Sequence, residues 1–307
     1  MGQLVRRLRI RHFELLSHLA LDPTLRAAAA KMALTQPAAT KLLQDIENVF
    51  QASLFQRGSA GLIATPVGQY LMEQATLVIN RLSHVAENTH QISHGRWPSI
   101  RIGTYSVLPR VPMAIAALRR EFPKVSVLIR EATIRTLLEE LAAGKLDAVV
   151  GTVPPDLLAS SYLVGMNVQP VSHDKLCVVA SPSHPLCRRR LLSWPDLYGC
   201  AWLLPPTESL LRRAFTGKYL DLGLTPPLPT VELLSPVLTA ELLTRDPSLI
   251  GLLRHEHAAV ETSKKVLKQL RTVDQVSLPA LSFISLLSSQ PSSLALEKFR
   301  LLLCKEN

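Results

Sequence analysis

The first third of the chain carries apolar residues at helical spacing. Those between Phe13 and Ala20 share one face of a predicted helix, which ends at Asp22-Pro23 because proline disfavours helical backbone in the residue before it. An alanine-rich helix is predicted over Leu25 to Met32, with Thr24 in the position of an N-cap. Its small side chains allow a neighbouring helix to cross closely.

A further helix is predicted directly after the short turn Ala33-Leu34-Thr35. Thr35 can cap this helix, Pro37 is tolerated in its first turn, and the apolar residues between Ala38 and Ile46 form a stripe along it. A polar, glycine-containing loop over residues 57–61 then leads to a short apolar strand. This order predicts two helices joined by a tight turn and followed by a wing.

A single long helix is predicted from about Pro66 to His94. Five of its apolar positions are spaced by four, three, four and three residues: Leu71, Ala75, Val78, Leu82 and Val85. A spacing that averages 3.5 residues is typical of a coiled-coil seam, so these side chains are predicted to pair two copies of the chain. The alternative is a helix that packs against its own domain.

Strands and helices are predicted to alternate in the rest of the chain. A strand–helix–strand–helix–strand run between Ile100 and Gly151 predicts a mostly parallel sheet. A second run begins near Leu176, and its predicted strands lie at 176–180, 201–204, 230–234, 249–253, 272–278 and 281–287. A closing helix is expected over Leu294 to Leu303. This pattern predicts two α/β lobes.

Composition adds a basic charge and excludes several classes of protein. The formal net charge of +10 indicates polyanionic partners, with nucleic acid ahead of a membrane surface. The four cysteines have no metal-ligand spacing, no apolar run approaches the length of a transmembrane helix, and the N-terminus lacks the apolar segment of a secretory signal. No catalytic motif is found. We therefore expect a cytoplasmic protein that is not an enzyme and holds no metal or cofactor.

The start of the predicted third helix carries side chains that can read DNA. Gln36 can bond adenine, Thr40 offers a hydroxyl and a methyl group that can touch thymine, and Lys41 can reach guanine or phosphate. Recognition helices generally contact bases through their N-terminal residues. Up to residue 66, eight basic residues stand against four acidic ones. The alternative is a plain helical hairpin on which Thr40 and Lys41 are only solvated.

Residues 8–68 resemble the winged helix-turn-helix of the LysR-type transcriptional regulators. The resemblance is carried by TLRAAAAKMALTQPAATKLLQDIENVFQASLFQR, followed by TPVG. Within the family, RLRIRHFELL and QPAATKLLQDIE are most similar to the branch that regulates aromatic-acid or sugar catabolism. Farther along, LRREFPKVSV and LLEELAAGKLDAVVG follow in the family's order. One departure is the turn after Glu47, where Val49-Phe50-Gln51 stands in place of the usual Leu-Gly.

The resemblance implies an α+β protein in three parts. These are an N-terminal winged helix-turn-helix (1–66), a linker and dimerisation helix (67–97) and a C-terminal effector-binding domain (98–307). The last part would be a two-lobed α/β domain like a periplasmic binding protein, with lobe I at about 98–164 and 268–307 and lobe II at about 165–267.

The family's DNA contacts can be carried over to matching positions of this chain. They fall on Thr24, Arg26, Thr35, Gln36, Pro37, Thr40, Lys41 and Arg57. Two identical heads imply a double-stranded operator with approximate two-fold symmetry. Members of the family form dimers and often tetramers, and RNA polymerase is a further candidate partner.

A small effector is expected between the two lobes, where strands end and helices begin. Backbone N–H groups at such positions favour an anion. The candidate residues are Thr104, Tyr105, Ser106, Thr133, Pro205 and Thr207. Their hydroxyl groups predict a carboxylate or sugar-like ligand that modulates operator binding or promoter activation. The alternative role of Ser106 and Thr133 is an ordinary N-cap, and that of Tyr105 is packing. The competing function is an enzyme or a transport-type binding protein with a helical N-terminus.

Overall fold

The computed structural model describes residues 6–58, 61–95, 97–105, 108–158, 163–287 and 293–304. The chain divides into two compact units. The first unit comprises residues 1–103, 124–149 and 285–293, and the second comprises 104–123, 150–284 and 294–307.

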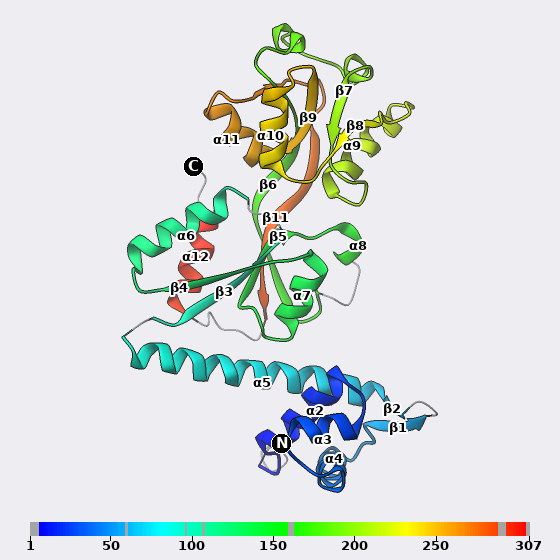
Figure 1. Ribbon diagram of the computed structural model, residues 1–307, viewed down its shortest axis with the longest axis vertical. Helices are drawn as coiled ribbons and strands as arrows, with labels where there is room; N and C mark the ends of the chain where they lie inside the picture. The colour runs from blue at the N-terminus through cyan, green and yellow to red at the C-terminus, as the bar shows by residue number, and fades with distance from the viewer. Residues whose placement is uncertain are drawn as a thin grey trace. The chain divides into compact units, whose positions relative to one another are not determined.

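The first unit begins with a helical head and a hairpin. Its elements are α2 (Ile10–Leu21), α3 (Leu25–Lys31), α4 (Gln36–Phe50), β1 (Phe55–Gly58) and β2 (Gly61–Ala64) (Figure 1). The Thr24 hydroxyl accepts a hydrogen bond from Ala27 N at 3.3 Å, and the Thr35 hydroxyl accepts one from Ala38 N at 3.4 Å. Both side chains therefore cap the helices that the sequence assigns to them, and the winged helix-turn-helix is present as predicted.

One apolar core holds the head together. Its buried members come from all three helices, from the segment leading into the wing and from the next helix: Leu15, Leu16, Leu19, Ala28, Ala29, Ala39, Leu43, Ile46, Leu54, Phe55 and Ala75. Ala28 and Ala29 of α3 and Ala39 of α4 are almost fully covered, and their small side chains let these two helices approach closely. Burial of each large aliphatic side chain contributes roughly 1.5–3 kcal/mol to the stability of such a core.

Two turns of the head contain a residue other than glycine in left-handed backbone. Ala33, between α3 and α4, has a φ of 53°, and Gln51, just after α4, has a φ of 51°. Gln51 lies in the turn that usually contains glycine in the family. Its side-chain Nε2 donates a hydrogen bond to Asn48 O at 2.6 Å, which satisfies one of the free carbonyl groups at the end of the helix. The departure from the family's sequence therefore leaves the turn intact.

The long helix α5 (Pro66–Ser93) begins against the segment that precedes the wing. Its N-cap, Thr65, donates from both its backbone N and its hydroxyl to Leu54 O, at 2.9 and 3.2 Å. A Cβ added to Gly68, in the first turn, would lie 2.1 Å from the same carbonyl oxygen. The start of α5 can therefore lie this close to the segment only with glycine at position 68.

A small α/β layer completes the first unit. Its elements are β3 (Ser99–Thr104), β4 (Ser126–Glu131), α7 (Ile134–Ala142) and β5 (Ala148–Thr152), and the strand order is β4-β3-β5. Leu137, Leu138 and Leu141 cover one face of α7 and are fully buried. The strand–helix alternation agrees with the prediction for this part of the chain.

Polar side chains attach α5 to this layer. His84 Nδ1 lies 3.0 Å from Arg101 Nη2, and Arg101 forms an ion pair of 2.9 Å with Asp147. Asn88 Oδ1 accepts a hydrogen bond from Ser99 N at 3.0 Å. Burial lowers the pKa of His84, Asp147 opposes that shift, and the Arg101 charge adds to it. The imidazole is therefore held neutral, in the form that can accept from the guanidinium.

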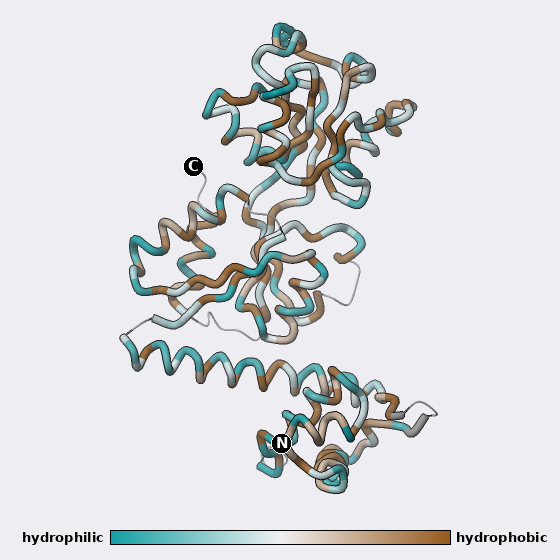
Figure 2. Tube along the Cα trace, viewed as in Figure 1, coloured by the Kyte–Doolittle hydropathy of each residue, from teal (hydrophilic) through white to brown (hydrophobic). Residues whose placement is uncertain are grey.

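The second unit contains the remaining elements. They are α6 (Arg110–Glu121), α8 (Pro155–Leu158), β6 (Met166–Ala180), η2 (Pro185–Arg188), η3 (Pro195–Leu197), β7 (Ala201–Leu204), α9 (Leu210–Asp221), β8 (Pro229–Glu232), α10 (Pro236–Arg245), β9 (Leu249–Arg254), α11 (His255–Ser263), β10 (Lys268–Leu270), β11 (Val276–Leu286) and α12 (Leu294–Cys304). The strand order is β11-β6-β9-β7-β8, with β10 beside β6. Figure 2 shows hydrophobic residues concentrated on the strands.

The sheet of the second unit is mixed, and the sequence did not predict the directions of its strands. Strand β7 is parallel to β8 and β9, whereas β6 is antiparallel to β9 and β10. Strand β6 also begins at Met166, ten residues before the predicted strand. The sequence did not indicate this first part, because it is mostly only partly buried and has no run of apolar residues. Strand β11 is one continuous strand through Pro279 instead of two.

An aromatic cluster positions α9 in the second unit. Phe215 and Tyr219 on this helix pack against Trp194 and Trp202, with ring centroids 4.8–6.2 Å apart. The Tyr219 hydroxyl donates to Trp194 O at 3.2 Å, and burial raises the pKa of this tyrosine. The cluster thereby fixes the start of α9 beside the loop that follows β7. No helix within the described ranges is long and apolar enough to cross a membrane.

Replacing Gly68 by alanine should destabilise the head, because the new methyl group would displace the backbone of Leu54. We expect a loss of about 1–3 kcal/mol of unfolding free energy, as for other overpacked sites. Urea denaturation of the full chain measures it. Gly217→Ala in α9 is the matched control, since its Cβ would meet nothing within 4 Å, and it should be neutral or stabilising by up to about 1 kcal/mol. Equal effects of the two substitutions would contradict the close approach.

Candidate nucleic-acid interface and effector region

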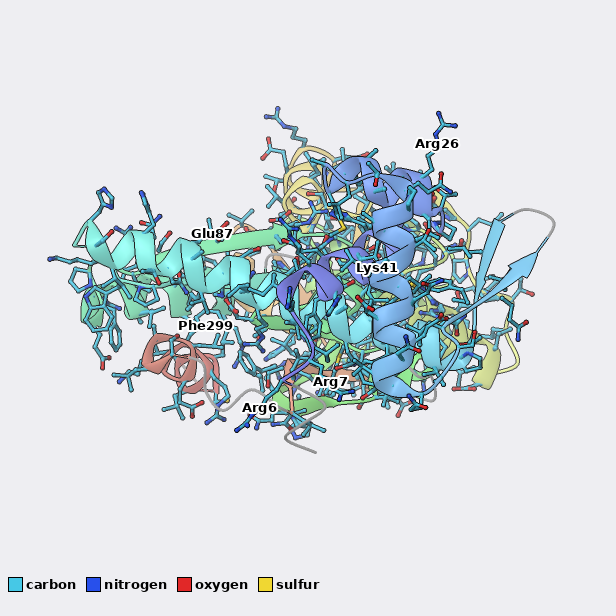
Figure 3. The ribbon with its side chains drawn as sticks, turned by 90° about the horizontal axis from the view of Figure 1, so that it is seen from below. Arg6, Arg7, Arg26, Lys41, Glu87 and Phe299 are labelled. Carbon is cyan, nitrogen blue, oxygen red and sulfur yellow. The ribbon has the colours of Figure 1, made fainter. Side chains whose placement is uncertain are left out.

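The start of α4 presents four residues that we call the candidate reading face: Gln36, Pro37, Thr40 and Lys41. Gln36, Pro37 and Lys41 are exposed, and Thr40 is half-buried. The Thr40 hydroxyl donates its proton to Gln36 O at 2.9 Å. Its methyl group can still contact a base, and its oxygen can still accept a hydrogen bond. Figure 3 shows Lys41 on the outer side of the helix, pointing away from the head. The opposite side of α4 carries Leu43 and Ile46 in the core.

The other predicted DNA contacts lie at the start of α3 and in the wing. Thr24 donates from its hydroxyl to Asp22 Oδ1 at 3.0 Å, in addition to capping the helix. Arg26 is exposed and, within the part of the chain that the structure describes, forms no ion pair. Arg57 pairs through its backbone with Leu62 in the hairpin, but its side chain and residues 59–60 lie outside the described part.

Glu47 links the end of α4 to the wing, and sequence reasoning did not assign it a role. Its Oε1 accepts a hydrogen bond from Leu54 N at 2.7 Å and lies 3.5 Å from Ser53 Oγ. A charged acceptor makes such a bond stronger than one between neutral groups. The carboxylate therefore fixes the direction in which the chain leaves the helix for β1. Only the folded turn brings these residues together, so the sequence carried no signal for the pair.

The predicted seam of α5 divides into two parts. Ala75 is 1% exposed within the core of the head, and Leu71 packs partly against the same core. Val78, Leu82 and Val85 are exposed along the helix. The N-terminal part of the seam therefore packs against the head of the same chain, whereas the later part is exposed.

The expected effector residues lie on several loops. Thr104 is fully buried at the end of β3, and Tyr105 beside it is exposed. Pro205 is buried and Thr207 is exposed in the loop after β7. Ser106 lies outside the described residues. Thr133 belongs to the other unit, where its hydroxyl accepts from Thr136 N at 3.3 Å as the N-cap of α7.

Arg212, in the first turn of α9, is a charged residue that sequence reasoning missed. It is 6% exposed, and its Nη1 donates to Pro205 O at 3.3 Å. Its Nε is buried without a hydrogen-bond partner, and no ion pair to it is found among the described residues. The Ser209 hydroxyl caps the same turn by accepting from Arg212 N at 3.1 Å. A buried cation with only a neutral acceptor is costly and favours an anionic partner.

The comparisons with known proteins agree with this architecture. The family model described as "LysR substrate binding domain" matches residues 95–271, and the one described as "Bacterial regulatory helix-turn-helix protein, lysR family" matches residues 10–69. The chain belongs to the LysR family of transcriptional regulators. The regulator is therefore a DNA-binding protein with a substrate-binding domain and not an enzyme, which confirms the function class and the fold predicted from its sequence.

The sequence matches to individual relatives cover most of the regulator. It is 30% identical over 247 residues to the HTH-type transcriptional regulator GbpR of Azospirillum brasilense, and the match covers 79% of this chain and 71% of the relative. It is 28% identical over 222 residues to GbpR of Rhizobium radiobacter, covering 71% and 72%. The fold is similar to that of a full-length OxyR variant from Pseudomonas aeruginosa, with a TM-score of 0.60, 18% identity and coverage of 96% and 94%.

A solved structure of CbnR bound to its target DNA also has this fold. The TM-score is 0.52 at 17% identity, and the match covers 96% of this chain and 98% of that one. At this level of identity the likeness concerns the fold alone.

Removal of the side chains of Thr40 and Lys41 should weaken operator recognition. A good base contact discriminates by about 1–3 kcal/mol, so Thr40→Ala with Lys41→Ala should raise the operator Kd about tenfold or more while dimers persist. Fluorescence anisotropy with the upstream intergenic duplex measures this. Lys145→Ala, which removes an exposed lysine from the loop before β5, should leave the Kd unchanged. An unchanged operator Kd in the double variant would refute the candidate reading face.

Proposed function

We propose that this regulator binds a roughly two-fold symmetric operator as a dimer and responds to a small anionic effector held in its substrate-binding domain. The observation that carries the proposal is the match of residues 95–271 to the LysR substrate binding domain, in a chain whose head is a capped helix-turn-helix. An effector shifts the equilibrium between two conformations of such a regulator only if it binds one of them more tightly than the other. Effector occupancy would thereby change operator binding or promoter activation.

The anionic character of the effector is inferred from Arg212. Its guanidinium is buried beside the loop after β7, and its Nε lacks a partner among the described residues. A carboxylate is the group that this planar fork binds best, and the N-terminus of α9 adds backbone N–H groups and a favourable dipole. The hydroxyl groups of Tyr105 and Thr207 are further polar candidates from the predicted set. Ser106 and Thr133 stay in that set as predictions.

Aromatic carboxylates are the first effector class to test, followed by sugar acids. This order follows from the resemblance of the N-terminal segment to regulators of aromatic-acid or sugar catabolism. An uncharged sugar is the second candidate, supported by the hydroxyl-bearing residues of the predicted set. We also propose that the protein is cytoplasmic, where operator DNA and small metabolites meet.

The pairing of two chains is assigned to the exposed part of the seam. Val78, Leu82 and Val85 would meet the same residues of a second copy, since each helix alone leaves them in water. Two heads on paired helices fit an operator with two half-sites. We also propose that two dimers assemble into a tetramer, as members of the family often do, and that the protein contacts RNA polymerase.

A ligand that binds the folded state adds about 2.7 kcal/mol to the free energy of unfolding at a hundredfold excess over its Kd, and this raises the melting temperature. A thermal-shift screen of aromatic acids, sugar acids and neutral sugars against the full chain should therefore find a carboxylate that raises Tm. The shift should be lost in Arg212→Gln and partly kept in Arg212→Lys, because lysine retains the charge without the fork. A neutral sugar that stabilises the wild type and Arg212→Gln equally would contradict an anionic effector.

The matched control for Arg212 is its neighbour Arg213, which is exposed and lies 3.9 Å from Asp156 in a surface ion pair. Arg213→Gln should keep the full thermal shift. Operator binding without ligand should be the same in all of these variants, since the head is untouched.

Lysine at two exposed seam positions should separate the paired chains. Leu82→Lys with Val85→Lys places like charges opposite each other in a parallel or antiparallel pair and removes apolar contact. Sedimentation velocity should then show monomers in place of dimers, with weaker operator binding. Glu87→Lys, an exposed change elsewhere on the same helix, is the control and should keep the dimers. Intact dimers in the double variant would rule out this seam.

A further inference from the structure

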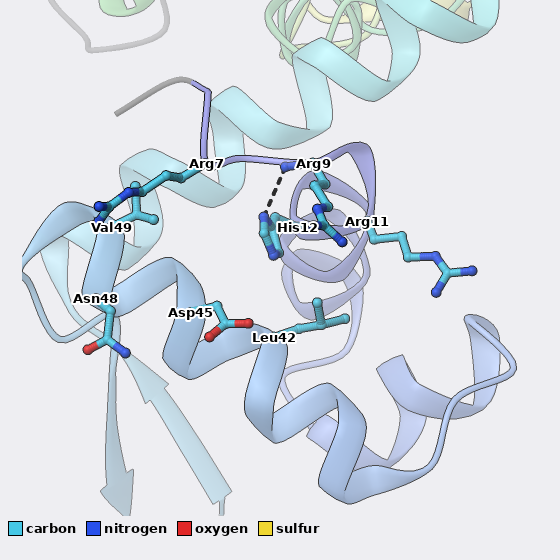
Figure 4. A pocket seen from close by; sticks show the side chains of 8 residues that line it. All are labelled: Arg7, Arg9, Arg11, His12, Leu42, Asp45, Asn48 and Val49. Carbon is cyan, nitrogen blue, oxygen red and sulfur yellow. Dashed lines mark hydrogen bonds between the residues drawn. The ribbon is translucent and has the colours of Figure 1, made fainter. Parts of the chain in front are cut away.

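A cavity of about 420 Å³ lies in the head beside the C-terminal half of α4 (Figure 4). One side is formed by the segment that leads into α2 and by its first turn, and the other side by α4. Arg7, Arg9 and Arg11 contribute from the first side, and Asp45 and Asn48 from the second. The residues that form the cavity thus come from two segments that lie far apart in the sequence.

The cavity has an excess of positive charge. Three arginines are among the residues that line it, against one carboxylate, and all four side chains are exposed. In the described part of the chain, none of the three arginines forms an ion pair, and Asp45 forms none either. Cations in excess over nearby carboxylates repel one another, and an anion from outside relieves that repulsion.

The backbone at the cavity is held in place by His12. This side chain is 6% exposed, and its Nδ1 accepts a hydrogen bond from Arg9 N at 3.0 Å. Burial lowers the pKa of His12, the Asp45 charge opposes the shift, and the Arg9 charge adds to it. The imidazole stays neutral and can accept this bond. The arginine-bearing segment is therefore anchored at the start of α2 instead of being a loose tail.

The cavity continues the candidate reading face along the helix. Lys41, Asp45 and Asn48 follow one another at spacings of four and three residues, which places them on one side of α4. At about 1.5 Å per residue, Asp45 and Asn48 lie roughly 14 and 18 Å along the axis from Gln36. In Figure 3, Lys41 and Arg7 are both drawn near α4, whereas Arg26 projects from the upper edge of the head.

The dimensions of DNA indicate what would meet this end of the helix. The major groove is about 12 Å wide. When the N-terminal turns of α4 lie in the groove, a point roughly 14–18 Å farther along the helix lies at the edge of the groove, where the sugar-phosphate backbone runs. Arginine and asparagine are common donors to phosphate oxygens, and such contacts fix register without reading sequence.

We propose that Arg7, Arg9 and Arg11 form a phosphate-binding site for the DNA backbone that borders the groove read by α4, with Asn48 as an additional donor. The proposal rests on DNA binding by the helix-turn-helix, and it adds a contact that neither the reading face nor the wing provides. Asp45 weakens this contact and limits the affinity for DNA of any sequence.

The test compares two variants that remove equal charge. Arg7→Ala with Arg9→Ala changes the cavity, whereas Arg188→Ala with Arg190→Ala removes two exposed arginines of the second unit. Each full-length protein is titrated by anisotropy with the upstream intergenic duplex and with a scrambled duplex of the same length, between about 50 and 200 mM salt. Circular dichroism melts verify that the variants remain folded.

The cavity variant should lose about tenfold in affinity for both duplexes at about 0.1 M salt, because phosphate contacts carry no sequence information. The slope of log Kobs against log salt should become shallower by about two, one for each phosphate contact removed. Arg7→Lys with Arg9→Lys should keep the wild-type slope. The control variant should match the wild type in both respects.

Asp45→Asn provides an independent test with the opposite sign. Removing the carboxylate should raise the affinity for both duplexes about threefold, since it no longer opposes a phosphate in the cavity. Unchanged affinity in both the Asp45→Asn and the Arg7/Arg9 variants would overturn the proposal. So would a calorimetric titration in which inorganic phosphate binds the wild type and not the arginine variant while DNA affinity stays equal, because the cavity would then serve a small anion. A wild type that binds neither duplex would instead refute DNA binding by the head as a whole.

Discussion

The backbone of Leu54 is the point at which the recognition helix, the wing and the linker helix are joined. Its N–H is bound by the Glu47 carboxylate from the end of α4, and its carbonyl oxygen accepts two hydrogen bonds from Thr65 at the start of α5. Gly68 lets the first turn of α5 approach the same oxygen. Each of these groups would be costly to leave unsatisfied in a partly buried turn. The recognition helix, the wing and the linker helix are therefore joined through the backbone N–H and the carbonyl oxygen of this one residue.

From this junction, α5 runs to the α/β layer of the first unit, where it is attached by polar contacts. His84, Arg101 and Asp147 form one connected group, and Asn88 binds the first residue of β3. Polar networks of this kind are sensitive to geometry, since a hydrogen bond weakens steeply when its angle changes. These contacts fix the direction of the C-terminal half of α5, whose apolar residues Val78, Leu82 and Val85 are exposed.

The two groups of arginines in this regulator stand in opposite environments. Those around the cavity of the head are exposed, so water stabilises them until a polyanion arrives, and binding is then driven by release of counterions. Arg212 is buried, so its charge lacks hydration and depends on a specific partner. The first arrangement is suited to a repeating, sequence-independent ligand such as the DNA backbone. The second is suited to a single small anion of defined shape.

Local patterns in the sequence were sufficient for the elements whose structure depends on neighbouring residues. Thr24 and Thr35 cap the helices that follow them, the alanines between them let two helices cross closely, and the 3.5-residue spacing marks the length of α5, because capping and periodicity act over one or two turns. Family resemblance added the identity of the whole protein.

Tertiary structure alone decided the features that depend on residues far apart in the chain. In the folded chain Ala75 is buried in the core of the head instead of being exposed in the seam. Strand β6 is antiparallel to β9, and β11 is one continuous strand that includes Pro279. It also buried Arg212 and brought three N-terminal arginines beside the end of α4. Burial and charge clustering are properties of the packed chain, and no window of neighbouring residues contains them.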